Sequence, residues 1–189
     1  MKLFTLSIFI FLLHGCCGSA SSGPTPSTST AGSTAAMLTY ENTLFTLHHG
    51  YLKIFDLTDP SRPTLANSIA ATSTETLFIE GHHLFIGGNS GVQILDIQDP
   101  TNPVDVSFYV HVRGCDPVIV ENDIGYVTLR SRPGCFGDAN RLEVVDFSDI
   151  ANPKEIARYP MTYPYGLAKL DNHLAVCEDY AGLVLLSIE

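Results

Sequence analysis

The sequence has few basic side chains, with 10 Lys and Arg against 20 Asp and Glu in 189 residues and a formal net charge of −10. Surfaces that bind nucleic acids need clustered Lys and Arg, because contacts to the phosphates supply much of the affinity. We therefore expect no nucleic-acid partner.

Motifs of the common enzyme classes are also lacking. The chain contains no GxSxG, Walker or HExxH motif and no paired-carboxylate signature. The sequence therefore points to no catalytic residue and no cofactor, and an enzymatic role is the less favoured hypothesis.

Long apolar runs are missing too. The longest N-terminal run spans Leu3 to Leu13, 11 residues, whereas a spanning helix needs about 20. With Lys2 before it and Gly15 and Cys16 after it, the run suits a secretory signal. "LHGC" at 13–16 resembles the lipobox of bacterial lipoproteins, in which the Cys is acylated. We predict a signal peptide over 1–15, lipidation of Cys16 and a membrane anchor in the bacterial envelope, with the outer membrane favoured; an ordinary signal peptide is the alternative.

A tract without charge follows the predicted lipidation site. Residues 18–36 contain nothing larger than Thr or Pro. Such a segment cannot bury enough apolar area to offset the entropy of ordering it, so 16–36 is predicted to be a lipidated, flexible tether. The folded region is expected to be 37–189.

Helical periodicity is absent from this region, and a repeat takes its place. "IFDLTDPSRP" at 54–63 recurs as "ILDIQDPTNP" at 94–103 and "VVDFSDIANP" at 144–153, and "LLSIE" at 185–189 starts a fourth version. Four short strand-like runs in about 40 residues indicate a β-propeller blade. We predict an all-β, β-propeller-like array of three complete blades and a partial fourth without its last strand, an open arc in preference to a closed ring.

The repeated motif has a structural interpretation. Asp59 and Pro60 suit the first two positions of a type I turn, and Pro63 suits the entry to an outer, edge strand. Asp56, within the preceding strand, is predicted to accept hydrogen bonds between blades. The Asp series is therefore expected to be scaffold, since residues that recur in every repeat usually are.

Strand direction places the loops on two opposite faces. Second-to-third strand loops share a face with the connections between blades, which brings Cys115 close to Cys135 in the insertion "RSRPGCFGDANR" at 130–141. We predict a Cys115–Cys135 disulfide, with Cys177 as a competing partner. His48 and His49 fall on this face but His82, His83 and His173 on the other, so no metal site is predicted, because one ion cannot bind both groups.

The motif segments "LKIFDLTDPSRP", "VQILDIQDPTNP", "LEVVDFSDIANP" and "LVLLSIE" resemble the LVIVD repeat family. This resemblance covers about 37–189 and implies a propeller-like fold on secreted or surface-anchored bacterial proteins, with no catalytic residues to carry over. Ile150 departs from the family pattern, where Pro is usual.

Three functional hypotheses follow. The first is a surface- or periplasm-exposed, non-catalytic binding or scaffolding module for a protein or glycan, with a ligand face comprising Arg130, Arg132, Phe136, Asp138, Arg141, Tyr163, Tyr165 and Tyr180. The second is an envelope hydrolase that uses Asp116, Asp138, Arg130, Arg141 and Glu178. The third is a truncated fragment of a longer lipoprotein.

Overall fold

The computed structural model describes residues 35–72, 75–114, 117–131, 137, 139–179 and 181–188. Every helix or strand within these ranges is a β-strand, as the sequence predicts. They include no helix that is long and apolar enough to cross a membrane.

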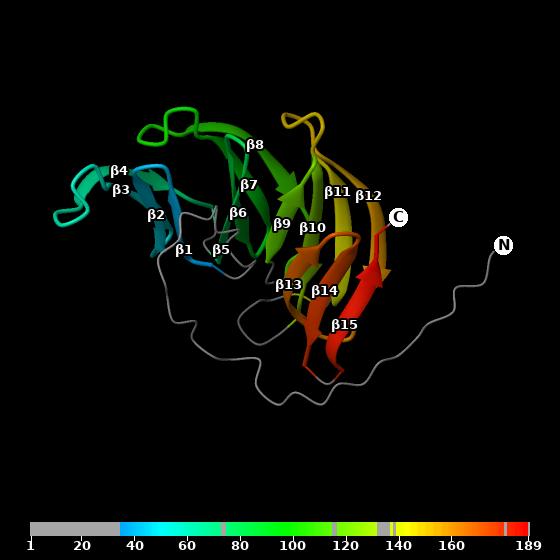
Figure 1. Cartoon of the computed structure of the whole chain (residues 1–189). Helices are drawn as coiled ribbons and strands as arrows, with labels where there is room; N and C mark the ends of the chain where they lie inside the picture. Colours follow the sequence, from blue (N-terminus) through cyan, green and yellow to red (C-terminus); the bar gives the residue numbers. More distant parts are fainter. Residues whose placement is uncertain are drawn as a thin grey trace.

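The strands form four antiparallel sheets, which we call blades 1 to 4 in chain order (Figure 1). In each blade the strands are hydrogen-bonded in sequence order, from the innermost strand outward. Blade 1 comprises β1 (Met37–Tyr40), β2 (Thr43–His48), β3 (Tyr51–Asp56) and β4 (Thr64–Ala70). Blade 2 comprises β5 (Thr76–Glu80), β6 (His83–Gly88), β7 (Gly91–Asp96) and β8 (Val104–Val110).

Blade 3 comprises β9 (Val118–Glu121), β10 (Ile124–Leu129), β11 (Arg141–Asp146) and β12 (Lys154–Pro160). Blade 4 comprises β13 (Pro164–Leu170), β14 (His173–Glu178) and β15 (Gly182–Ser187). The prediction of three complete blades and a partial fourth is confirmed.

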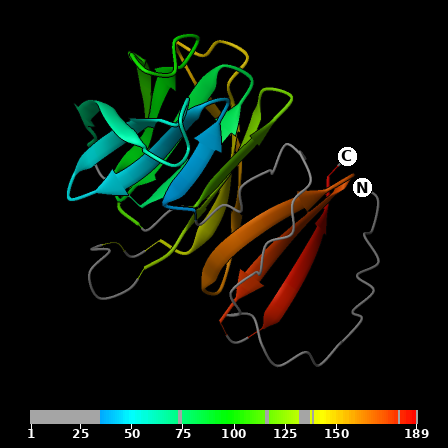
Figure 2. The ribbon, with the colours of Figure 1, turned by 60° about the vertical axis from the view of Figure 1, so that its left-hand side comes forward.

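The blades follow one another along an arc. The innermost strands contact in chain order, β1 with β5, β5 with β9 and β9 with β13, and the described residues provide no comparable contact between β1 and β13. Figures 1 and 2 show blade 1 and blade 4 at opposite ends of this arc. Over the described residues the array is therefore open, as expected.

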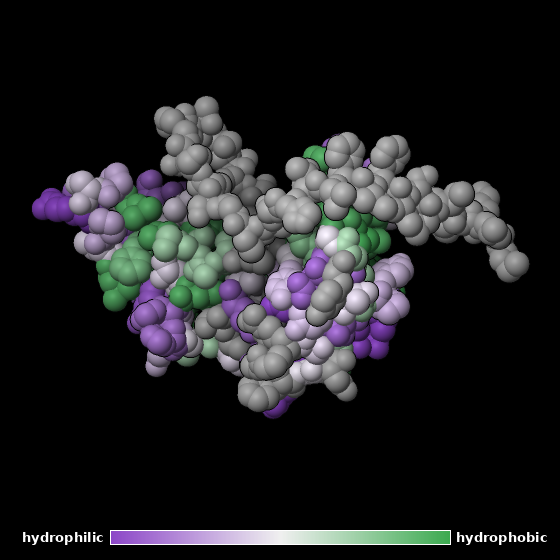
Figure 3. Space-filling model, turned by 90° about the horizontal axis from the view of Figure 1, so that it is seen from below, coloured by the Kyte–Doolittle hydropathy of each residue, from purple (hydrophilic) through white to green (hydrophobic). Residues whose placement is uncertain are grey.

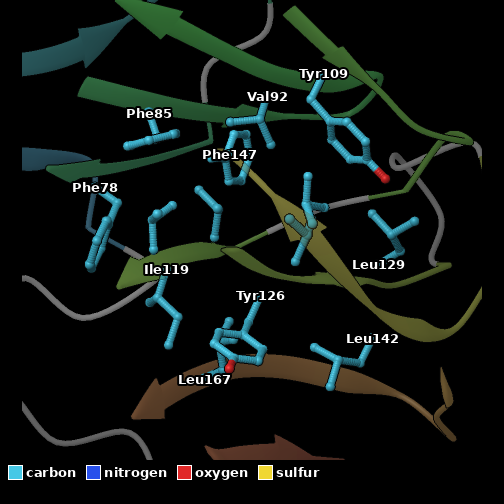
Figure 4. Close-up of a cluster of buried hydrophobic side chains, with 14 of the residues drawn as sticks. Phe78, Phe85, Val92, Tyr109, Ile119, Tyr126, Leu129, Leu142, Phe147 and Leu167 are labelled. Atoms are coloured by element: carbon cyan, nitrogen blue, oxygen red, sulfur yellow. The ribbon is translucent and has the colours of Figure 1, made fainter. Parts of the chain in front are cut away.

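The core lies between the blades. One apolar cluster joins blades 1 and 2, and a larger one runs from blade 2 to blade 4. Figure 4 shows the larger cluster, in which the rings of Phe85 and Phe147 meet edge to face with centroids 5.1 Å apart. Neighbouring blades cover a central sheet on both sides, which explains why β7 is buried on both faces from Gly91 to Leu95.

The Asp-Pro motif builds the same turn in three blades. The backbone N–H of Arg62 donates to the carbonyl oxygen of Asp59 at 2.9 Å, and the equivalent bonds of blades 2 and 3 measure 3.0 and 2.9 Å. The predicted turn is confirmed, and Ile150 in place of Pro leaves it intact.

The prediction that Asp56 bonds between blades is wrong. Its carboxylate accepts hydrogen bonds from the backbone N–H and the hydroxyl of Thr58, at 2.7 and 2.6 Å. Asp96 and Asp146 likewise accept from the backbone N–H two residues further on. A carboxylate at a strand end reaches this local donor before any other blade, so the Asp series shapes its own turn.

Side-chain hydrogen bonds from the fourth strands link the outer parts of neighbouring blades. The third and fourth strands of each complete blade shift register at the same place, after Ile54, Ile94 and Val144. Beside this bulge, the Asn67 side chain donates to the carbonyl of Thr101 in blade 2 at 3.1 Å, and the Ser107 hydroxyl donates to that of Ile150 in blade 3 at 2.6 Å. A bulge changes the direction in which nearby side chains point, and here it directs the polar side chains of Asn67 and Ser107 toward the turn of the next blade.

Backbone hydrogen bonds confirm how the loops divide between two faces. The connections between blades donate to the second-to-third strand loops, for example Ala71 to Gly50 at 2.9 Å and Met161 to Asn140 at 3.0 Å. We call this side the loop face. On the other side, the end of each third strand binds the first-to-second turn, as in Ile97 to His82 at 2.8 Å. Across the described ranges, no three His, Cys, Asp or Glu side chains gather as metal ligands.

Candidate ligand-binding face

The junction of blades 3 and 4 gathers aromatic and cationic groups on the loop face. Arg130 follows the end of β10, and Tyr165 lies on β13 of the neighbouring blade. The guanidinium carbon of Arg130 lies 3.8 Å from the ring centroid of Tyr165, and the ring of Tyr163 lies 5.7 Å from that of Tyr165. Three residues of the predicted ligand face are thus brought together.

The members of this stack differ in what they present to solvent. Arg130 is only 7% exposed, whereas Tyr165 is 38% exposed. A cation over a tyrosine ring is attracted by the ring's quadrupole, and more strongly when it is desolvated. A ligand approaching here therefore meets tyrosine first, with the guanidinium behind it.

Arg141, another residue of the predicted ligand face, pairs with a buried carboxylate. Its Nε donates to Oε1 of Glu143 at 2.7 Å, and a terminal nitrogen binds the same oxygen. Glu143 is fully buried, and its Oε2 accepts the Tyr109 hydroxyl at 2.7 Å. Burial and then this hydrogen bond raise the pKa of Tyr109 well above its usual range, so the hydroxyl keeps its proton. Arg141 thus belongs to a network that joins blade 2 to blade 3.

Sequence reasoning missed Glu143 and Tyr109. The available signal was the position of Glu143 inside "RLEVVD", the third strand of a predicted propeller blade, since the neighbouring blades cover such a strand on both sides. Fully buried carboxylates are rare unless they are paired. A charged residue in such a strand therefore predicts partners nearby, although not which ones.

Glu178, a member of the predicted hydrolase cluster, also has a local partner. It is buried at the end of β14 and accepts a hydrogen bond from the backbone N–H of Thr162 at 2.7 Å. This bond ties the connection between blades 3 and 4 to blade 4. The other carboxylates of that cluster, Asp116 and Asp138, lie outside the described residues.

The blade 3 insertion is tied at its base by side-chain hydrogen bonds, and Gly137 within it contacts the preceding connection. Ser131 and Asn140 exchange hydrogen bonds of 3.0 and 2.9 Å. Gly137 lies so close to Arg113 that a Cβ would fall 1.7 Å from the Arg113 carbonyl oxygen. Gly137 thus lies against the connection into blade 3.

The predicted disulfide would join this connection to the insertion. Cys115 and Cys135 themselves lie outside the described residues, as do Arg132, Phe136 and Tyr180. Cys177, the competing partner, is half-buried on β14. Non-reducing peptide mapping of the exported protein tests the prediction, and a Cys115–Cys177 link or unlinked thiols would contradict it.

The comparisons with known proteins agree with the repeat pattern. The model of the LVIVD repeat matches residues 40–72, 71–110 and 135–161, together more than half of the chain. The chain belongs to the LVIVD repeat family. The three matches fall on blade 1, on blade 2 and on the second half of blade 3.

Among solved structures, this LVIVD repeat protein is similar to the computationally designed protein Ika4. The TM-score is 0.62 at 12% identity, and the alignment covers 87% of this chain and 95% of the other. At that identity the likeness concerns the fold alone. No curated protein matches the sequence.

Proposed function

We propose that this LVIVD repeat protein is a non-catalytic binding module whose protein or glycan ligand contacts Tyr163 and Tyr165. The observation that carries the proposal is the stack of Arg130, Tyr165 and Tyr163 on the loop face. Insertions on one face of a repeat array often mark its binding side, and the blade 3 insertion begins beside this stack. The repeat family and the blade fold favour the same class of function.

The chemistry of the stack suits recognition. Tyrosine provides a large, rigid and amphipathic contact area at low entropic cost, and both Tyr and Arg are enriched among residues that dominate binding energy. The bond from Thr162 to Glu178 fixes the segment that carries Tyr163. The rings are therefore preorganised, which lowers the entropic cost of binding.

The hydrolase hypothesis is less well supported. Hydrolysis by carboxylates needs two such groups aimed at one substrate. Glu143 is held by Tyr109 and Arg141, and Glu178 by the Thr162 amide. These bonds give both carboxylates structural roles.

We further propose that the module works in the bacterial cell envelope. The predicted signal peptide and Cys16 would anchor it to a membrane, with the outer membrane favoured, and 17–36 would hold the blades away from the lipid. Stable anchoring needs more than one acyl chain, which the lipoprotein pattern supplies.

Site-specific photocrosslinking in intact bacteria tests this function. A photoreactive residue placed at Tyr165 should form a defined adduct with a protein or a polysaccharide. The same residue at Tyr159, which is exposed on the outer strand of blade 3, should not. Changing Tyr163→Ala should reduce the Tyr165 adduct at least tenfold. Equal labelling from both positions would overturn the proposal.

A further inference from the structure

The far side of blade 4 exposes apolar residues whose counterparts in the other blades are buried or half-buried. Leu183 on β15 is 61% exposed, whereas Leu52, Val92 and Leu142 at the equivalent place are at most 2% exposed. Leu185, two residues on, is 60% exposed, whereas its counterparts Ile54 and Ile94 are fully buried and Val144 is half-buried. In blades 1 to 3 the following blade covers these positions. We call this uncovered surface the trailing face.

Blade 1 shows the converse at the other end of the arc. Met37 on β1 is 63% exposed, whereas the equivalent Leu77, Val118 and Leu167 are at most 4% exposed because the preceding blade covers them. Leu44 and Phe55 lie on the same side of blade 1 and are half-buried. We call this the leading face, and Figure 3 shows hydrophobic residues (green) at the surface of blade 1, on the left.

The two faces are the halves of a contact that the chain already makes. Inside the molecule, Leu52 and Ile54 on the trailing side of blade 1 pack in one cluster with Leu77 and Leu84 on the leading side of blade 2. The cluster from blade 2 to blade 4 repeats this arrangement. The trailing side of one blade therefore packs on the leading side of the next, and the described part of the chain has one uncovered copy of each face.

Few charges oppose such a contact. Besides Leu183 and Leu185, the trailing face includes Ala175 and Cys177, the cross-strand neighbours of those leucines on β14. On the leading face, Lys53 sits over the ring of Tyr51 and hydrogen-bonds to Ser68. Depletion of charged residues is characteristic of interface cores.

We propose that the protein associates head to tail, with the trailing face of blade 4 in one copy packed on the leading face of blade 1 in a second copy. The array of blades then continues from one chain into the next. Such a contact is heterologous, so it closes into a ring if the rotation between copies allows it. The proposal does not depend on the ligand-binding function.

Sedimentation velocity of the exported protein in mild detergent tests this contact. The wild type should sediment as an oligomer, and Leu185→Lys and Met37→Lys should each sediment as a monomer, with association weakened at least tenfold. Because both side chains are largely exposed, the lysines should leave the fold intact, which circular dichroism verifies. Val110→Lys on blade 2, 72% exposed and on neither end face, is the matched control and should associate like wild type.

Mixing Leu185→Lys with Met37→Lys tests whether the contact is head to tail. Leu185→Lys keeps an intact leading face and Met37→Lys an intact trailing face, so an equimolar mixture should form a heterodimer although neither variant associates alone. A monomeric wild type would overturn the proposal. So would Met37→Lys chains that associate as strongly as wild type, which would mean that trailing faces pair with each other or with a different partner.

Discussion

Glu143 shows how a single buried charge can join two blades. Its carboxylate receives Arg141 from its own strand and the Tyr109 hydroxyl from the outer strand of blade 2. A buried carboxylate is tolerated when it is paired and its oxygens are hydrogen-bonded, and it is costly when a partner is removed. The pairing therefore favours one relative placement of blades 2 and 3.

Removing the Tyr109 hydroxyl should destabilise the protein, because Glu143 is buried. Tyr109→Phe leaves the buried Glu143 without one of its donors and should lower the free energy of unfolding by about 1–3 kcal/mol. Urea unfolding followed by fluorescence measures the change. Tyr159→Phe, at an exposed site, should change stability little. Equal stability of wild type and Tyr109→Phe would show that the bond contributes nothing net.

The absence of a side chain at Gly125 is compensated by the large ring of Phe147, directly after the neighbouring strand. Blades 1, 2 and 4 carry Leu at this place, but a Cβ on Gly125 would lie 2.2 Å from the ring of Phe147. In the other blades Leu or Ile replaces Phe147: Leu57, Ile97 and Ile188. In blade 3 the larger ring of Phe147 therefore fills the space that the leucine side chain occupies in the other blades, as close packing requires.

Among the elements, the bulged outer strands act as links between blades. Ser107→Ala removes the bond to the Ile150 carbonyl and should destabilise the protein by about 0.5–1.5 kcal/mol in chemical denaturation. The chain contains its own control, because Ala157 occupies the equivalent place in blade 3 and the described residues of blade 4 include no turn to which a side chain there could bind. Ala157→Ser should therefore gain nothing. A gain from Ala157→Ser, or no loss from Ser107→Ala, would contradict this role.

The Asp turns should make stability sensitive to acid. Hydrogen bonds from the Thr58 hydroxyl and then its amide lower the pKa of Asp56, and Asn102 and then Thr101 lower that of Asp99. Because the folded pKa values lie below the ordinary 3.8, the unfolded chain takes up protons first as the pH falls. Their contribution is complete above the ordinary value and is lost as the pH falls through the lower, folded values.

Denaturation curves at a series of pH values measure this effect. The free energy of unfolding of Asp56→Asn/Asp99→Asn should depend less on pH below about 4 than that of wild type. The two proteins should show parallel profiles at neutral pH. An unchanged acid slope in the variant would mean that other carboxylates dominate.

For the whole molecule, the N-terminal pattern makes a prediction about location. Wild-type protein expressed in a bacterial host should incorporate labelled palmitate, and Cys16→Ser should abolish the label. Cys17→Ser is the matched control and should retain it. Unchanged labelling of Cys16→Ser would overturn the assignment.

Predictability differed between the parts of the candidate site. The shared face of Arg130, Tyr163 and Tyr165 followed from strand direction alone, because antiparallel strands return successive loops to the same side. The pairing of Arg141 with the buried Glu143 did not follow, since that network includes Tyr109 from another blade, 34 residues away from Glu143. Local spacing carries no information about that meeting.

By itself, the sequence determined the number of blades, the strands in each and the Asp-Pro turns, because short-range periodicity and turn chemistry act within a few residues. Only the tertiary structure decided which polar groups join the blades and which apolar faces stay uncovered. Leu52 and Leu183 have the same place in their repeats, yet one is buried and the other is exposed. The physical reason is that burial is set by the neighbouring blade, and a residue's place in its own repeat does not specify whether that neighbour is present.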